Sequence, residues 1–138
     1  MAAIVNVCVD PRLNHEVVRL QVQSRLERLG LATSRVVITS DVGGNIGSAF
    51  SGTVDLLRVD GEQVVFAAVL HHDDCVASRH SKRLPLATSL EAAQTALDSA
   101  GMHGSVLGGV LSTKDSTLTW SDQPARVHEV LNFRMPRL

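Results

Sequence analysis

Two cysteines and a pair of histidines are the residues of this sequence that can do chemistry together. Cys8 closes an apolar run, and His71, His72 and Cys75 follow directly after another. If these runs are neighbouring parallel strands, Cys8, His72 and Cys75 meet at one edge of the sheet. Two thiolates and one imidazole suit zinc, and three protein ligands leave a fourth position for water, as catalytic zinc requires. The alternative is two buried free cysteines, which are common core residues, and a histidine that caps a strand.

An acidic and a basic residue follow Cys8 at a spacing of two, as Asp10 and Arg12. Alternate residues of an extended chain share one side, so all three side chains can lie together. Asp10 can accept a hydrogen bond from a metal-bound water or ligate the metal itself, and Arg12 can hold it by a bidentate pair. The alternative is a solvated Asp-Pro turn with an exposed arginine.

The scaffold for these residues is expected to be one α/β domain that spans residues 1–138. Short apolar runs alternate with amphipathic segments, which favours parallel strands connected by crossover helices. The expected fold is a mainly parallel sheet of four strands plus an antiparallel edge strand, with helices on both faces. The expected strands are 2–9, 35–39, 63–70, 105–111 and the edge strand 118–120. Helices are expected from Asn14 until Gly30, over 48–57, and from a capping box of Thr88 and Glu91 until Gly101.

The segments between these elements are expected to be loops. Residues 41–47 form a glycine-rich turn, and the polar stretch 73–86 is either a surface loop or a short broken helix. The tail from Gln123 stays ambiguous.

Composition excludes several classes of function. The chain has 138 residues, 44% of them hydrophobic, and a formal net charge of -1 with scattered basic residues, so nucleic acid is not an expected partner. There is no Tyr and only one Trp, so platforms for stacking bases are missing. The N-terminus lacks the pattern of a signal peptide, and the longest apolar run, 64–70, is too short to span a bilayer. A cytoplasmic protein without membrane contact is the expectation.

The order of the motifs carries a resemblance to a known family. The first strand ends in C-V-D-P-R-L, the second leads to V-I-T-S-D-V-G-G, the third to H-H-D-D-C, and the fourth contains V-L-G-G-V-L. Together they resemble the β-class carbonic anhydrases, especially the compact branch with a doubled histidine before the second cysteine. The resemblance runs from about Ala2 to Asp122.

The resemblance implies a zinc lyase that hydrates carbon dioxide reversibly to bicarbonate by a zinc-bound hydroxide. It implies that Cys8, His72 and Cys75 bind the zinc and that Asp10 and Arg12 form the neighbouring dyad. In this family the aspartate either replaces the metal-bound water, which is inactive, or pairs with arginine and leaves the water in place. A homodimer or higher homo-oligomer with its active site near the subunit boundary is also implied. A small apolar substrate pocket is expected near Val42, Gly43, Gly44 and Leu70.

The sequence departs from the family at two places. Ser40 and Asp41 stand where the family has R-N before its glycines, so Asp41 adds an anion near the expected position of bicarbonate. Val76 replaces the glycine that usually follows the second cysteine, and it is a β-branched residue that disfavours positive φ and brings bulk close to the pocket.

These departures leave other readings open. One is a noncatalytic zinc-binding relative, and another is a related hydrolase that acts on carbonyl sulfide or carbon disulfide. Nucleotide binding at Gly43, Gly44 and Gly47 is a third, although their spacing is not that of a phosphate-binding loop. The sequence does not identify a proton shuttle among His15, His80 and His103.

Overall fold

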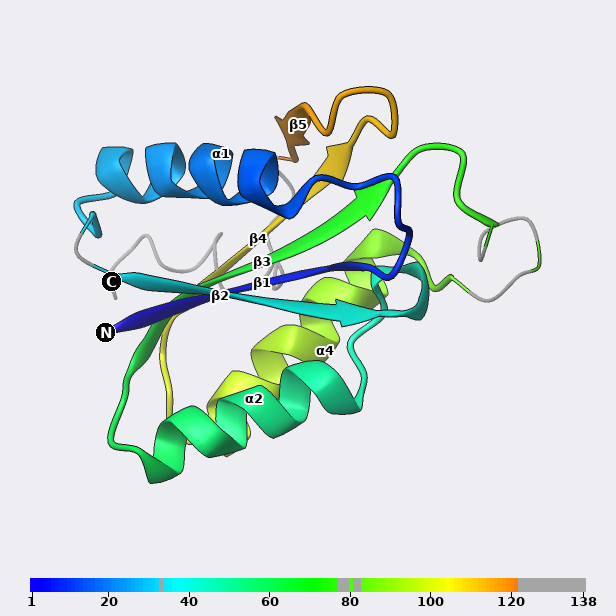
Figure 1. Cartoon of the computed structure of the whole chain (residues 1–138). Helices are drawn as coiled ribbons and strands as arrows, with labels where there is room; N and C mark the ends of the chain where they lie inside the picture. The colour runs from blue at the N-terminus through cyan, green and yellow to red at the C-terminus, as the bar shows by residue number, and fades with distance from the viewer. Residues whose placement is uncertain (33, 77–79, 81–82, 122–138) are drawn as a thin grey trace.

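A five-stranded sheet forms the centre of the protein, with helices on both of its faces (Figure 1). The computed structural model describes residues 1–32, 34–76, 80 and 83–121. Asp122 and the tail from Gln123 therefore lie outside the described residues, as does part of the stretch 73–86. The strands are β1 (Ala2–Cys8), β2 (Arg35–Asp41), β3 (Val64–His72), β4 (Ser105–Leu111) and β5 (Leu118–Trp120). The helices are α1 (His15–Arg28), the 3₁₀ turn η1 (Val42–Gly44), α2 (Ser48–Val59) and α4 (Leu86–Ser99).

The strand order is β2-β1-β3-β4-β5. The first four strands are parallel, and β5 pairs antiparallel with β4. This confirms the expected α/β class, the four parallel strands and the antiparallel edge strand. The interior strand β1 is buried along its whole length, and Cys8 is its last residue, at the carboxyl edge of the sheet.

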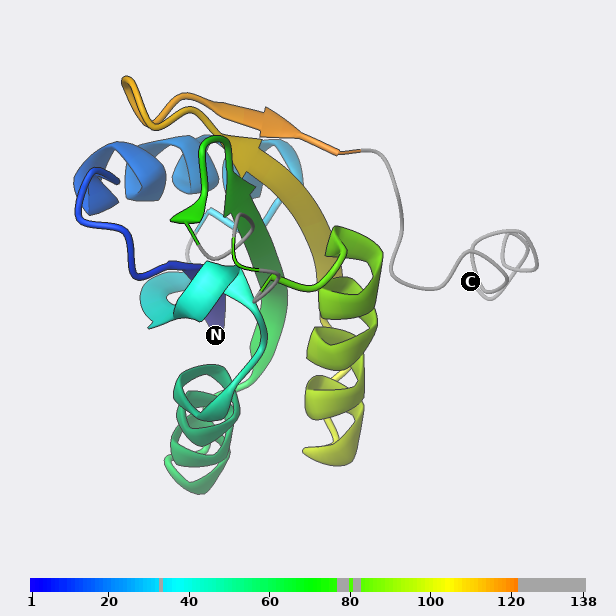
Figure 2. The same cartoon turned by 90° about the vertical axis from the view of Figure 1, so that its right-hand side faces the viewer.

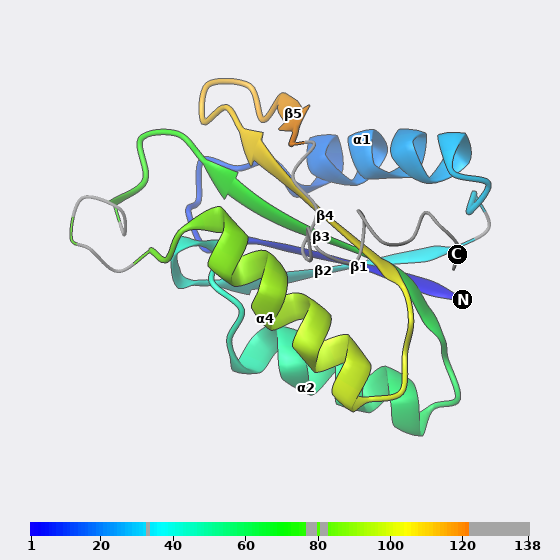
Figure 3. The ribbon, with the colours of Figure 1, turned by 180° about the vertical axis from the view of Figure 1, so that it is seen from behind.

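Each face of the sheet has its own apolar core. Helix α1 covers one face and packs against β1 and β3 through Val18, Val22 and Leu26. Helices α2 and α4 cover the opposite face, as the view from behind in Figure 3 shows. Because both faces are covered, the interior strands β1 and β3 are nearly continuous apolar runs without alternation. No helix among the described residues has the length and apolar character that a membrane crossing requires.

The two strands that follow β1 in the sequence, β2 and β3, lie on opposite sides of it in the sheet. The chain leaves β1 through α1 to reach β2, and then passes through α2 on the other face to reach β3, on the far side of β1. The connections after β1 and β3 therefore part to opposite faces, which opens a crevice at the carboxyl ends of these two strands. Figure 2 looks at this edge, where the loops after β1, β2 and β3 come together.

The expected strand and helix boundaries are mostly confirmed within two residues, and the differences at the start of α4 and at the end of β3 have physical reasons. Helix α4 begins at Leu86 with Pro85 as its N-cap residue, so the prediction of a capping box at Thr88 is wrong. The N–H of Thr88 is already bonded to the carbonyl of Pro85 inside the first turn. Strand β3 continues to His72, which pairs with Leu111, because β4 supplies ladder partners up to that point. Both histidines are thus the last residues of a strand instead of following it.

Candidate metal centre

Cys8, His72 and Cys75 come together at the carboxyl ends of β1 and β3. One possible ligand atom from each residue lies within 4.8 Å of the others, and all three residues are buried. Such a group can hold a metal ion. Both cysteines are free, so their thiols are available to bind one.

The ring of His72 is oriented for this task by the backbone. Its Nδ1 lies 2.6 Å from the carbonyl oxygen of Asp73, and because a carbonyl only accepts, we assign the proton to Nδ1. Nε2 then carries a free lone pair, and it is buried with no hydrogen-bond partner. A metal-binding histidine is normally held in this way by its second nitrogen. The unpartnered Nε2 beside two sulfur atoms therefore fits a metal ligand.

Opposing effects act on the pKa of the Cys8 thiol. Burial is the largest of them and raises the pKa of this thiol, while the backbone N–H groups of Asp10 and Gly43 act in the opposite direction. The nearby thiol of Cys75 raises the pKa further. A bound cation favours the thiolate form of a coordinating cysteine, and the two N–H groups are placed to support that form.

Asp10 stands beside this group and is held by Arg12. The guanidinium donates from Nε to Oδ1 at 3.0 Å and from Nη2 to Oδ2 at 2.7 Å, and the backbone N–H of Arg12 donates to Oδ1 as well. These hydrogen bonds lower the pKa of Asp10 to about 2, so its carboxylate stays ionised at every pH near neutrality. Its Oδ2 lies 3.8 Å from Nε2 of His72. The expected dyad is thus formed next to the candidate metal ligands.

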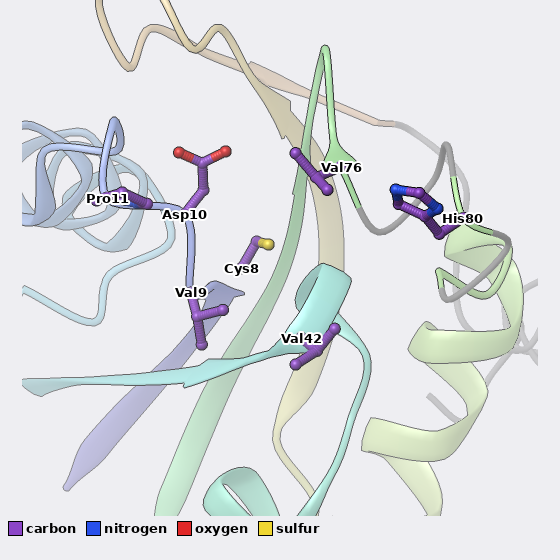
Figure 4. A pocket seen from close by; sticks show the side chains of 7 residues that line it. All are labelled: Cys8, Val9, Asp10, Pro11, Val42, Val76 and His80. Carbon is purple, nitrogen blue, oxygen red and sulfur yellow. The ribbon is translucent and has the colours of Figure 1, made fainter.

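An open cavity of about 410 Å³ adjoins the site at Cys8 and Asp10 (Figure 4). Its floor includes Cys8 and Asp10, and its walls are mostly apolar. The lining consists of Cys8, Val9, Asp10, Pro11, Val42, Val76 and His80. The cavity thus offers an uncharged small molecule a path to the candidate metal centre.

The glycine-rich turn forms one side of the site by close packing. Asn6 donates from Nδ2 to the carbonyls of Gly44 and Asn45, and its Oδ1 accepts from the hydroxyl of Thr39. Gly44 has φ +75°, and a Cβ there would lie 2.8 Å from the carbonyl oxygen of Leu70. Only glycine fits this approach, and it brings η1 against the ends of β1 and β3.

The structure separates the residues that were expected to line the substrate pocket. Val42 lines the cavity, whereas Gly43 and Gly44 are buried and absent from its lining. Leu70 itself does not line the cavity, because it is fully buried in the core beneath α1.

The structure also shows where Asp41 and Val76 lie, at the two places where the sequence differs from the pattern of the β-class carbonic anhydrases. One carboxylate oxygen of Asp41 is 3.4 Å from the backbone nitrogen of Gly47, at the start of α2, where the helix dipole favours an anion. Asp41 is not among the residues that line the cavity. Val76 does bring bulk to the cavity wall, but the positive φ of this segment belongs to Asp74, so the expected backbone conflict at Val76 is absent.

Sequence reasoning missed three residues around the centre. Asp74 binds Arg12 through its side chain and its carbonyl, and Arg83 donates to the carbonyl of His72 at 2.9 Å. These contacts join residues sixty-two and eleven positions apart, and no local pattern marks them. Asn6 did carry a signal, since it is the one amide in an otherwise apolar strand.

The three histidines that were considered as proton shuttles, His15, His80 and His103, lie in different parts of the structure. His80 lines the cavity. His15 begins α1, and His103 lies between α4 and β4, at the opposite edge of the sheet. The structure therefore brings one of the three to the site.

Comparison with known proteins gives no further guide, since no protein-family model and no curated protein matches this chain.

Proposed function

We propose that this protein is a zinc enzyme that hydrates carbon dioxide reversibly to bicarbonate, similar to the β-class carbonic anhydrases. The observation that carries the proposal is the buried, unpartnered Nε2 of His72, beside two cysteine sulfurs and near an apolar cavity. Thiolate ligands combined with imidazole suit zinc. When bound, zinc supplies a hydroxide nucleophile near neutral pH.

The residues around the candidate metal centre have separate roles in the proposed reaction. Asp10 would accept a hydrogen bond from the water or hydroxide that the metal would hold, and Arg12 holds the Asp10 carboxylate in place. Val42 and Val76 provide apolar walls that suit an uncharged substrate better than an anion. His80 lines the same cavity, so we propose it as the group that relays a proton.

Metal analysis and stopped-flow kinetics on the purified protein test this proposal. We expect close to one zinc ion per chain and hydration of carbon dioxide between pH 6 and pH 9, followed with a pH indicator. Addition of a strong chelator should remove both, and zinc should restore both. Protein that takes up no zinc contradicts the metal centre. Full zinc content without turnover supports instead the noncatalytic zinc-binding alternative.

The mostly apolar lining of the cavity is equally compatible with related substrates of the same hydroxide. Carbonyl sulfide and carbon disulfide are linear, uncharged and less polar than bicarbonate, and the walls of the cavity are mostly apolar. Their hydrolysis releases hydrogen sulfide, which is measured directly. Faster release of hydrogen sulfide than hydration of carbon dioxide would assign the enzyme to this second reaction. Nucleotide binding has no comparable support, because Gly43 and Gly44 are buried.

We also propose that two copies of the chain associate across the mouth of the cavity. Val9, Val42 and Val76 are each at least half exposed there, and all three line the same opening. Clustered apolar side chains of this kind are typical of interaction surfaces. Sedimentation velocity should give the mass of a dimer, and Val42→Ser combined with Val76→Ser should shift the protein toward the monomer. A monomeric wild-type protein at micromolar concentration contradicts this arrangement.

A further inference from the structure

Arg12 is bound by two carboxylates that come from different strand ends. On one side it makes the paired contacts to Asp10. On the other side its Nη1 donates to Oδ2 of Asp74 at 2.9 Å, and its Nη2 donates to the backbone carbonyl of Asp74 at 2.8 Å. The guanidinium therefore links the segment after β1 to the segment after β3, sixty-two residues further along the chain.

The backbone of Asp74 has the conformation that this contact requires. Its φ is +48°, and among the described residues only Ser116 shares a positive φ without being glycine. Such a conformation is unfavourable for most side chains and is found mainly where surrounding contacts enforce it. It turns the carbonyl of Asp74 toward Arg12 directly before Cys75. The turn that presents a candidate metal ligand thus also presents two acceptors to Arg12.

The position of Asp10 explains why the contacts from Asp74 to Arg12 are important. Its Oδ2 lies only 3.8 Å from Nε2 of His72, the atom we assign as a metal ligand. A carboxylate oxygen is itself a good ligand for zinc, so a small movement of Asp10 would bring it into the fourth position of the ion. Arg12 opposes this movement through its bidentate contact, and Arg12 in turn is held from the far side by Asp74.

We propose that Asp74 is a positioning residue that holds Arg12 against Asp10 and thereby keeps the fourth position of the metal open to an external ligand. The proposal rests on the metal centre of the proposed function, but not on the reaction catalysed there. It adds a third member to the Asp10 and Arg12 pair.

Cobalt(II) in place of zinc makes the fourth position visible, because its absorption bands respond to a change of ligand. Azide is the external ligand in this test. Asparagine at position 74 keeps the size of the side chain and tolerates positive φ, but it lacks the charge. We expect D74N to bind one cobalt ion, with azide affinity about 10- to 100-fold weaker than that of the wild type. Circular dichroism checks that the variant is folded.

The double variant separates positioning from a general structural effect. In D10N/D74N the competing carboxylate is gone, so azide affinity should return to within about threefold of that of D10N alone. A purely structural role of Asp74 would not be rescued by a change at Asp10. Wild-type azide affinity in D74N, or no recovery in D10N/D74N, overturns the proposal.

The same measurements distinguish this proposal from the proposed function. If the wild-type protein takes up no cobalt, both the metal centre and the proposed role of Asp74 are contradicted. If it binds cobalt and azide as described but does not hydrate carbon dioxide, the enzyme assignment fails and the role of Asp74 stands.

Discussion

Replacing His72 with glutamine is expected to abolish zinc binding. The substitution removes the unpartnered Nε2 that lies with the sulfurs of Cys8 and Cys75 and leaves only two of the three protein ligands. Changing even an outer partner of a ligand weakens metal affinity by about 10- to 100-fold, so losing a ligand should weaken it by more than about 100-fold. Zinc content after dialysis and competition with a chromophoric chelator measure the effect.

The neighbouring histidine provides a matched control. His71 is almost as buried and belongs to the same strand, but successive side chains of a strand point to opposite faces. The ring of His71 packs near Gly44, and burial above all, with the positive charge of Arg83 second, lowers its pKa to about 4. It is therefore neutral near pH 7, and glutamine is a fair replacement. H71Q should retain zinc, and equal loss of zinc in both variants would contradict the assignment of His72.

The meeting of Cys8, His72 and Cys75 was predictable from the sequence because it depends on general rules of parallel sheets. Apolar runs fixed the approximate ends of the strands, and the carboxyl ends of neighbouring parallel strands lie at one edge. The prediction also required β1 and β3 to be neighbouring strands, and the strand order confirms that they are. The spacing of Asp10 and Arg12 from Cys8 then predicted that this pair lies beside the candidate metal ligands.

The surroundings of the centre were not predictable in the same way, because they depend on pairing and on distant contacts. The length of β3 is set by its ladder with β4, and the apolar run gives no sign that His71 and His72 take part in it. The contact between Arg12 and Asp74 joins residues that no periodic pattern relates. Which side of the turn Asp41 faces is likewise decided by the position of α2.

Asp10→Asn is expected to lower kcat/KM for carbon dioxide hydration by about a hundred- to ten-thousand-fold while zinc stays bound. Asparagine keeps the size of the side chain but cannot provide the carboxylate that orients the hydroxide, and loss of a positioned acid or base group commonly has an effect of this size. Because the pKa of Asp10 is about 2, its charge is complete over the whole assay range. Any change of rate between pH 6 and pH 9 must then come from another group, and D10N should lower the rate by a similar factor across that range.

Asp41→Asn is the control for this prediction, since it removes a negative charge from the same edge of the sheet. The Asp41 carboxylate faces Gly47 and does not line the cavity, so D41N should keep kcat/KM within about threefold of the wild type. Zinc content and kinetics measured on both variants separate a specific role of Asp10 from a general effect of charge. If D41N loses as much activity as D10N, the charge of the edge matters and the orienting role of Asp10 fails. If D10N keeps full activity, the hydroxide is oriented without a carboxylate, and the proposed mechanism is wrong at its central step.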